Sequence, residues 1–418
     1  MSLLAEHQVV IQFLGKVFIQ FQTLIIKEDA FLRPIIGSQD CSISSRTPVT
    51  DEFLLDDGDV GDTMVFGKVV GGRQTMGTAT DDHDIIAGTH FMVIPHSLSH
   101  ASSFLNETGS TDSPVGIKPT PIPTSISASK SDSEKLKSKN YDNYIDLLKE
   151  PNLDGVIVCS ETNLHFELVK NITENKKHCF IEKPLGIGKK DSFEMANLIE
   201  SSNIIFQTGY FMRSNPVYIK LKELITANYF GEISRIRLVN CHDGIMRDIF
   251  KNYQWMTDPK VAGVGAFGDL GTHVLDLLLW FFSDVESVSA TFTKVYNQYP
   301  GCEESGEALI KFKSGLIASI AAGWIDVAQP YTIFVSGTKA HARTTNEQLI
   351  INENKDGKKI ERIEENLPET LPHAFDLFLN SLISNNIKYL VKASDAALRS
   401  SIMSAIYQSE KEKKWINI

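Results

Sequence analysis

A strand–helix–strand–helix–strand series between residues 155 and 206 constrains the fold of this chain more than any other feature. Short apolar runs at 155–159, 179–181 and 204–206 predict strands, and period-3.6 patterns at 163–175 and 191–202 predict the helices between them. The first run is apolar throughout, as in a strand buried on both faces of a parallel sheet. The order predicts a doubly wound, Rossmann-like α/β domain, which binds ligands at the carboxyl ends of its strands.

Upstream of this series the pattern is weaker. Residues 91–94 are predicted to form the first strand of the sheet, and residues 125–129 the second. Residues 1–84 lack a coherent pattern and are interpreted as an atypical N-terminal extension of uncertain structure. The Rossmann-like domain is therefore predicted to span 85–208.

Downstream of residue 230 the hydrophobic period changes from helical to alternating. Alternation predicts five strands, at 233–240, 286–296, 307–313, 316–322 and 331–336. Helices are predicted at 270–282, 373–384 and 393–410. Residues 209–418 should thus form an α+β domain with a large, mainly antiparallel sheet that has one covered face.

Charge and composition exclude several classes of partner. The 41 Lys and Arg residues against 52 Asp and Glu give a net charge of −11, which argues against nucleic-acid and anionic-membrane binding. The apolar stretch 9–26 is interrupted by Gln and Lys, and no basic segment precedes it, so neither a membrane span nor a signal peptide is predicted. Five scattered cysteines without a C-x-x-C pair predict no disulfide framework, no metal site and a cytoplasmic compartment.

Two groups of residues have the composition of a reactive site. Lys183, in Glu182-Lys183-Pro184, follows a predicted parallel strand and should lie in the ligand crevice; the alternative is a surface loop that starts a helix. Asp269 and His273 are four residues apart and share one helical face with Asp276. The alternatives here are that Asp269 is the N-cap of helix 270–282 and that His273 is a satisfied histidine beside the apolar face.

Several blocks between residues 140 and 418 carry a resemblance to a known family. They are Ser160-Glu161-Thr162-Asn163-Leu164-His165, similar to T-P-N-x-x-H; Glu182-Lys183-Pro184, identical to E-K-P; Gly209 to Pro216, similar to G-[FY]-x-x-R-[FY]-x-P; Phe230 to Ile233; and Asp269 to His273, similar to D-x-G-x-H. In these blocks the chain resembles the glucose-fructose oxidoreductase, inositol dehydrogenase and rhizopine-catabolism (Gfo/Idh/MocA) family. E-K-P and D-x-G-x-H at this separation form a specific combination.

The resemblance implies an NAD(P)-dependent oxidoreductase that transfers a hydride to or from a sugar, polyol or related hydroxyl or carbonyl compound. It implies a C-terminal domain that binds the small-molecule substrate and associates into dimers or tetramers. Lys183 would contact substrate and nicotinamide, His273 would be the acid/base, and Asp269 would orient the histidine or bind substrate. Other residues that it assigns to the cofactor are Ser160, Glu161, His165, Glu182 and Pro184. Arg213 would lie on the substrate side or be structural.

The chemistry fits these residue types. Loss of a hydroxyl proton needs a base near neutrality, and histidine has an unperturbed pKa of ~6.5. An ammonium such as that of Lys183 stabilises negative charge on the substrate oxygen. Lys183 and His273 are expected to face a cleft rather than a core, so that alanine variants of both remain folded.

The glycine-rich turn of the family is missing. Residues 95–100, which follow the predicted first strand, contain no glycine. Lys130 beside Ser129 is similar to the NADP-preferring pattern and favours NADP over NAD, although the alternative is a solvated loop lysine. Three explanations stay open: an active enzyme with a divergent phosphate loop, a catalytically impaired sugar- or nucleotide-sensing protein on the same fold, or a misjoined segment before residue ~120.

Overall fold

The computed structural model describes residues 141–418 apart from Asp142, Asn252, Asn346, Glu347 and Asp356, together with the backbone of two strands further upstream. These strands are β1 (Val65–Val69) and β2 (Thr89–Ile94). The apolar stretch 9–26, the turn at 95–100 and the predicted strand at 125–129, with Ser129 and Lys130, lie outside the described residues.

The first sheet confirms the Rossmann-like prediction. Its strand order is β1-β2-β3-β4-β5, with β3 (Gly155–Val158), β4 (His178–Ile181) and β5 (Phe206–Thr208). Strands β2 to β5 pair in parallel, and Phe91 lies opposite Gly155, so the strand predicted at 91–94 is confirmed. β1 pairs antiparallel with β2, so the sheet also draws on the segment interpreted as an extension.

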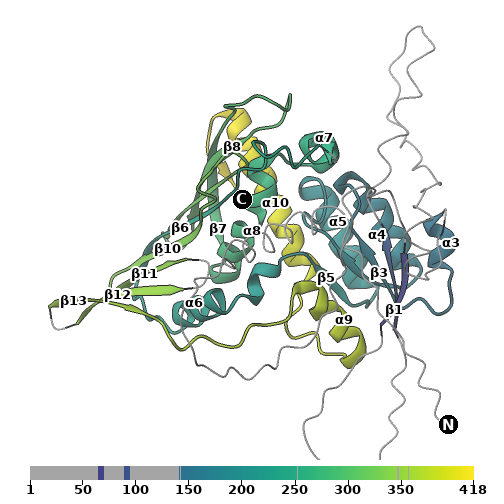
Figure 1. Ribbon diagram of the computed structural model, residues 1–418, viewed down its shortest axis with the longest axis horizontal. Coiled ribbons are helices and arrows are strands. Elements are labelled where there is room, and N and C mark those ends of the chain that lie inside the picture. Colours follow the sequence, from purple (N-terminus) through teal and green to yellow (C-terminus); the bar gives the residue numbers. More distant parts are fainter. Residues whose placement is uncertain are drawn as a thin grey trace, which may run out of the picture.

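Helices connect and cover these strands (Figure 1). They are α3 (Tyr144–Leu148), the 3-10 turn η3 (Thr162–Leu164), α4 (His165–Glu174) and α5 (Gly188–Ser201). The predicted helix at 163–175 is therefore a short 3-10 turn followed by an α-helix. The last strand begins two residues later than predicted, at Phe206 rather than residue 204.

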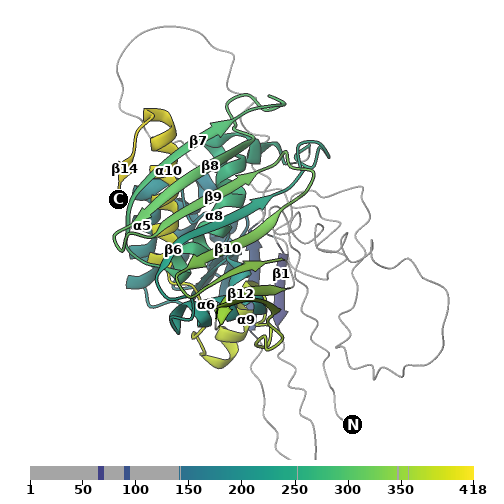
Figure 2. The same cartoon turned by 90° about the vertical axis from the view of Figure 1, so that its left-hand side faces the viewer.

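The second sheet has nine strands, which Figure 2 shows from their uncovered side. The five predicted strands are β6 (Ile233–Cys241), β7 (Val285–Thr293), β8 (Ser305–Phe312), β9 (Ile317–Gly323) and β10 (Tyr331–Gly337). Four more were not predicted: β11 (Ala340–Thr344), β12 (Leu349–Lys355), β13 (Lys358–Ile363) and β14 (Ile416–Asn417). All neighbours pair antiparallel except β6 and β9, which are parallel.

Helix α8 (Ala266–Phe281) covers the inner face of this sheet, where Val274 and Leu278 join Leu238 and Ile320 in one buried cluster. The remaining elements are η4 (Phe211–Ser214), α6 (Pro216–Thr226), η5 (Gln254–Thr257), α7 (Pro259–Ala262), α9 (Ala374–Ser384) and α10 (Ala393–Glu412). Helix α10 packs on α5 and on β7, so it joins the two sheets.

One helical stretch of the described residues, Pro259–Phe281, is long and apolar enough to cross a membrane by length and composition alone. Of its apolar window, 83% is buried inside the protein, as in the core helix of a folded domain.

Candidate active site

The two groups predicted from sequence meet where the two sheets adjoin. Lys183 follows β4, and its ammonium group donates to a carboxylate oxygen of Asp269 on α8 at 2.9 Å. The same nitrogen donates to the backbone oxygen of Asp269 at 3.1 Å. The relative exposure of the two residues is 0% and 7%, so this is a buried ion pair between residues 86 positions apart. The Lys183–Pro184 peptide bond is cis.

Asp269 is not the N-cap of its helix. Helix α8 begins at Ala266, with Gly265 in the N-cap position, so Asp269 lies inside the first turn and the N-cap alternative is wrong. Its second carboxylate oxygen accepts a hydrogen bond from the indole nitrogen of Trp324 at 3.3 Å. The carboxylate is therefore held between an ammonium group and an indole N–H.

His273 lies one helical turn after Asp269 and is 1% exposed. The rings of Tyr210 and Phe211 meet its imidazole edge-on, at centroid distances of 6.2 and 5.3 Å. The Tyr210 hydroxyl hydrogen-bonds that of Thr272 at 3.1 Å. The expectation that Lys183 and His273 face an open cleft is wrong, because both side chains are buried among elements of the two sheets.

The predicted cofactor residues at the strand ends are also buried. Ser160 and Glu161 follow β3, and Glu182 follows β4. A Glu182 carboxylate oxygen accepts from the backbone N–H of Lys183 at 3.1 Å. A Cβ atom on Gly209 would lie 2.6 Å from this carboxylate, so a larger residue there would displace the Glu182 carboxylate.

Two threonines at the carboxyl ends of the parallel strands indicate whether a dinucleotide can bind there. Thr162 follows β3 and Thr208 ends β5, and within the described part of the chain neither buried hydroxyl has a hydrogen-bond partner. Buried polar atoms are nearly always satisfied, and a polar ligand lying across the strand ends could satisfy these. The strand ends therefore fit a polar group of such a cofactor.

His165 has a different role from the predicted cofactor contact. Its Nδ1 lies 3.0 Å from the backbone oxygen of Leu185, and its Nε2 lies 3.2 Å from that of Ser160. The imidazole is 1% exposed. It links the loops that follow β3 and β4, so it supports the strand ends instead of presenting a ring nitrogen to a ligand.

Arg213 and Asp276 form a second buried ion cluster. The Arg213 guanidinium donates to both carboxylate oxygens of Asp276, from Nε at 2.8 Å. Arg399 on α10 donates to the same carboxylate at 2.9 Å. The structural alternative is thus the one that fits Arg213, because its guanidinium faces a carboxylate. Asp276 shares a helical stripe with Asp269 but serves this cluster.

His242 was not predicted from the sequence, although a histidine directly after a strand end is a usable signal. Its Nδ1 accepts from the backbone N–H of Gly244 at 2.9 Å, which leaves the proton of the neutral ring on Nε2. Its backbone N–H binds Gly323, next to Trp324. Burial lowers the pKa of His242 to about 4, against the opposing effect of Asp269. A neutral imidazole therefore stands beside the Asp269–Trp324 pair.

Comparison with known proteins gives the class. Residues 120–210 match the model of an oxidoreductase family with an NAD-binding Rossmann fold, and residues 218–343 match the Gfo/Idh/MocA C-terminal domain. The two matched models together describe an oxidoreductase family with an NAD-binding Rossmann domain. The chain belongs to the Gfo/Idh/MocA family.

The individual relatives are distant. The chain is 29% identical over 200 residues to myo-inositol 2-dehydrogenase of Thermotoga maritima, covering 45% of this chain and 55% of that protein. It is 27% identical over 147 residues to the rhizopine catabolism protein MocA of Rhizobium meliloti, covering 34% and 42%. The chain spans about half the length, or less, of these curated relatives.

Solved structures show the same fold. An inositol dehydrogenase homologue of Azotobacter vinelandii complexed with NAD+ has a TM-score of 0.62 at 15% identity, covering 70% of this chain and 87% of that one. Levoglucosan dehydrogenase in complex with NADH has a TM-score of 0.59 at 18% identity, covering 66% and 82%.

Proposed function

We propose that this protein is an NAD(P)-dependent dehydrogenase that interconverts a hydroxyl and a carbonyl group on a sugar, polyol or related compound. The observation that carries the proposal is the buried Lys183–Asp269 pair, with His273 one helical turn away, at the carboxyl end of a parallel strand. The inositol, levoglucosan and rhizopine relatives support the substrate class.

Three side chains divide the work. His273 takes the proton from the substrate hydroxyl in oxidation and returns it in reduction. The Lys183 ammonium stabilises negative charge that develops on the same oxygen, and Asp269 fixes the direction of that ammonium. A bound nicotinamide ring supplies the hydride acceptor or donor, and the residues at the ends of β3 and β4, including Ser160, Glu161 and Glu182, would hold it.

The test begins with cofactor binding. NADH and NADPH are titrated separately into the full chain while nicotinamide fluorescence is followed, and the cofactor that binds is then assayed against myo-inositol, levoglucosan and open-chain polyols. Binding with turnover that is lost in Lys183→Ala, in protein shown to be folded by circular dichroism, supports the proposal. We favour NADP because of Ser129 and Lys130, so NADPH is expected to bind more tightly than NADH.

A second candidate function is a sugar- or nucleotide-sensing protein on the same fold. The absence of glycine from residues 95–100 of the sequence favours it, since Cβ atoms in a phosphate-binding turn would crowd a pyrophosphate. Binding of neither cofactor at millimolar concentration, together with a thermal shift on adding sugars, would identify this function.

We also propose a homo-oligomer that forms through the outer face of the nine-stranded sheet (Figure 2). Leu309 on β8 and Ile317 on β9 point outward and are about half exposed, so a second copy packed on this face would cover both side chains. Light scattering should give a dimer or tetramer, and Leu309→Glu with Ile317→Glu should give a monomer. A monomeric parent protein would reject the proposal.

A further inference from the structure

The first turn of α8 is capped by side chains from two distant segments. The N-cap residue is Gly265, which has no side chain, and the first backbone N–H groups of any α-helix lack partners within the helix. Tyr407 and Glu303 supply the missing acceptors. The Tyr407 hydroxyl accepts from the backbone N–H groups of Gly265 and Gly268, at 2.9 and 3.1 Å. Glu303 accepts from Phe267 N with a carboxylate oxygen at 3.0 Å and from Ala266 N with its backbone oxygen at 3.2 Å. The helix therefore begins four residues earlier than its own sequence predicts.

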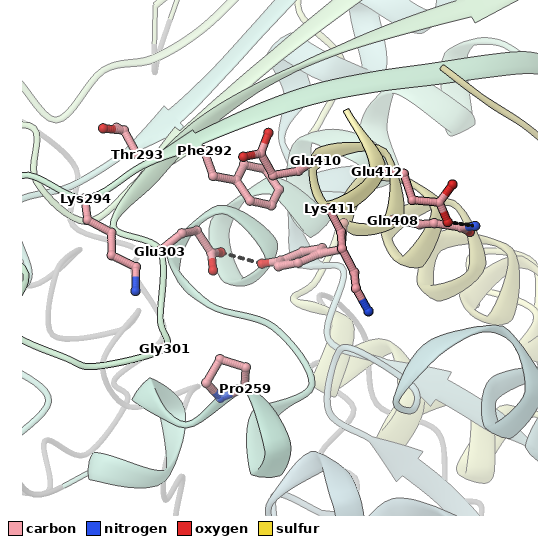
Figure 3. Close-up of a pocket in the computed structure, with 11 residues that line it drawn as sticks. Pro259, Phe292, Thr293, Lys294, Gly301, Glu303, Gln408, Glu410, Lys411 and Glu412 are labelled. Atoms are coloured by element: carbon pink, nitrogen blue, oxygen red, sulfur yellow. Dashed lines mark hydrogen bonds between the residues drawn. The ribbon is translucent and has the colours of Figure 1, made fainter. Parts of the chain in front are cut away.

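Glu303 and Tyr407 form one unit. The Tyr407 hydroxyl donates to the Glu303 carboxylate, and Glu303 is 7% exposed. A dashed line at the labelled Glu303 side chain marks this hydrogen bond in Figure 3. A Cβ atom on Gly265 would lie 2.2 Å from the Glu303 carboxylate, and one on Gly268 would lie 2.4 Å from the Val264 side chain and 2.8 Å from the Tyr407 hydroxyl. Gly265 thus leaves the space that the Glu303 carboxylate occupies. Burial raises the pKa of Glu303, while the helix N-terminus favours its charged form.

The cap adjoins the proposed active site. Asp269 directly follows Gly268, and Lys183 binds both the carboxylate and the backbone oxygen of Asp269. A shift of the first turn would therefore move the partner of Lys183 and, one turn later, His273. Displacing a reacting group by ~1 Å can cost ~10²-fold in rate.

We propose that Glu303 and Tyr407 are positioning residues of the active site, which hold the first turn of α8 so that Asp269 and His273 lie in register with Lys183. The inference rests on the proposed function. A cap that only stabilised the helix would change the stability of the protein but not the rate of the folded molecule.

The cap lies beside a pocket that water can enter, so its residues can be replaced without burying unsatisfied groups. Glu303 and Tyr407 line an open pocket between α7, the end of β7 and the end of α10 (Figure 3). Its other lining residues include Pro259, Phe292, Lys294 and Lys411. Water can enter on this side and hydrate backbone groups that a substitution exposes, so variants of the cap are expected to fold.

The experiment compares Tyr407→Phe and Glu303→Ala, which remove cap acceptors, with Glu303→Gln, whose amide oxygen can still accept from Phe267 N and the Tyr407 hydroxyl. Asn143→Ala is the matched control, because the Asn143 side chain caps α3 by accepting from Ile145 N at 2.8 Å and α3 carries no proposed catalytic residue. Each variant is assayed for kcat, KM and NAD(P)H affinity. Trp324, whose indole N–H binds Asp269, is followed by fluorine NMR of 5-fluorotryptophan-labelled protein.

Tyr407→Phe and Glu303→Ala should lower kcat by ~10–100-fold and should change KM and cofactor affinity by less than ~threefold. Both variants should also shift the Trp324 resonance. That resonance is assigned by its loss from the spectrum of Trp324→Phe. Glu303→Gln should keep the kcat and the Trp324 resonance of the parent protein, and Asn143→Ala should lower only the unfolding midpoint. An unmoved Trp324 resonance or unchanged kcat in the first two variants overturns the inference. If the parent protein binds no cofactor but the Trp324 resonance still shifts in Tyr407→Phe and Glu303→Ala, the proposed function is wrong, whereas the positioning of Asp269 by the cap is supported.

Discussion

Replacing Lys183 by methionine should destabilise the fold as well as abolish activity. The side chains of Lys183 and Asp269 are only 1% and 9% exposed, so the substitution leaves a buried carboxylate that keeps the Trp324 indole N–H but loses its cation. Breaking a buried pair in this way costs about 3–5 kcal/mol. With a urea dependence of about 3 kcal/mol per molar, a loss of about 4 kcal/mol lowers the unfolding midpoint by about 1.3 M.

The assay is equilibrium urea unfolding, with a matched pair on the surface as control. Lys311 and Glu286 lie 2.7 Å apart, but their side chains are 49% and 42% exposed. Lys311→Met should therefore cost less than about 1 kcal/mol. Adding Asp269→Asn to Lys183→Met should recover more than half of the loss, because the uncompensated charge is gone. A Lys183→Met protein as stable as Lys311→Met would refute the reasoning.

Three further predictions concern the neighbouring groups. His273→Ala should lower turnover by about 10²–10⁴-fold in a steady-state hydride-transfer assay, and a loss below threefold would remove it from the acid/base role. Arg213→Met should lower the free energy of unfolding by only about 1–3 kcal/mol, because Asp276 keeps its contact with Arg399. The same variant should change KM by less than threefold. A stable variant with a much higher KM would instead indicate that Arg213 binds substrate. The pKa of His242 is about 4 in the folded protein and about 6.5 in the unfolded chain. Between these pH values the unfolded chain therefore binds a proton that the folded protein does not. The free energy of unfolding should consequently fall by up to about 3 kcal/mol as the pH is lowered from 6.5 to 4. His242→Asn should flatten that part of the pH dependence, and identical pH slopes would contradict this.

Much of the parallel sheet could be predicted because its signals are local. The run at 155–159 is apolar enough to mark a strand buried on both faces, and its parallel neighbour at 178–181 ends in Glu182-Lys183-Pro184. The position of Lys183 at the carboxyl end of that strand follows from the topology alone. Strands β12 and β13 were missed since polar and charged residues such as Asn352, Asn354 and Lys359 interrupt their alternation.

Long-range partners could not be predicted. The sequence indicates a helix from residue 270, because two glycines precede it and Asp269 is a good N-cap residue. The helix starts at 266 only because Glu303 and Tyr407, 36 and 139 residues away from the groups they bind, satisfy its first N–H groups. No local pattern contains that information. The same holds for Arg399, which lies 123 residues from the carboxylate it pairs with.

The Lys183–Asp269 ion pair also links the two sheets. Lys183 belongs to the parallel sheet and Asp269 to the helix beneath the nine-stranded sheet, so separating the sheets would break a buried pair. Helix α10 packs against both α5 and β7, so the same boundary is also joined by this helix. Opening this boundary would hydrate both charges, so the ion pair itself adds little to the cost of opening, and the packing of α10 on α5 adds more. Because Lys183 already contacts Asp269 at 2.9 Å in the folded chain, we expect the geometry of this pair to be set when the chain folds, before substrate binds.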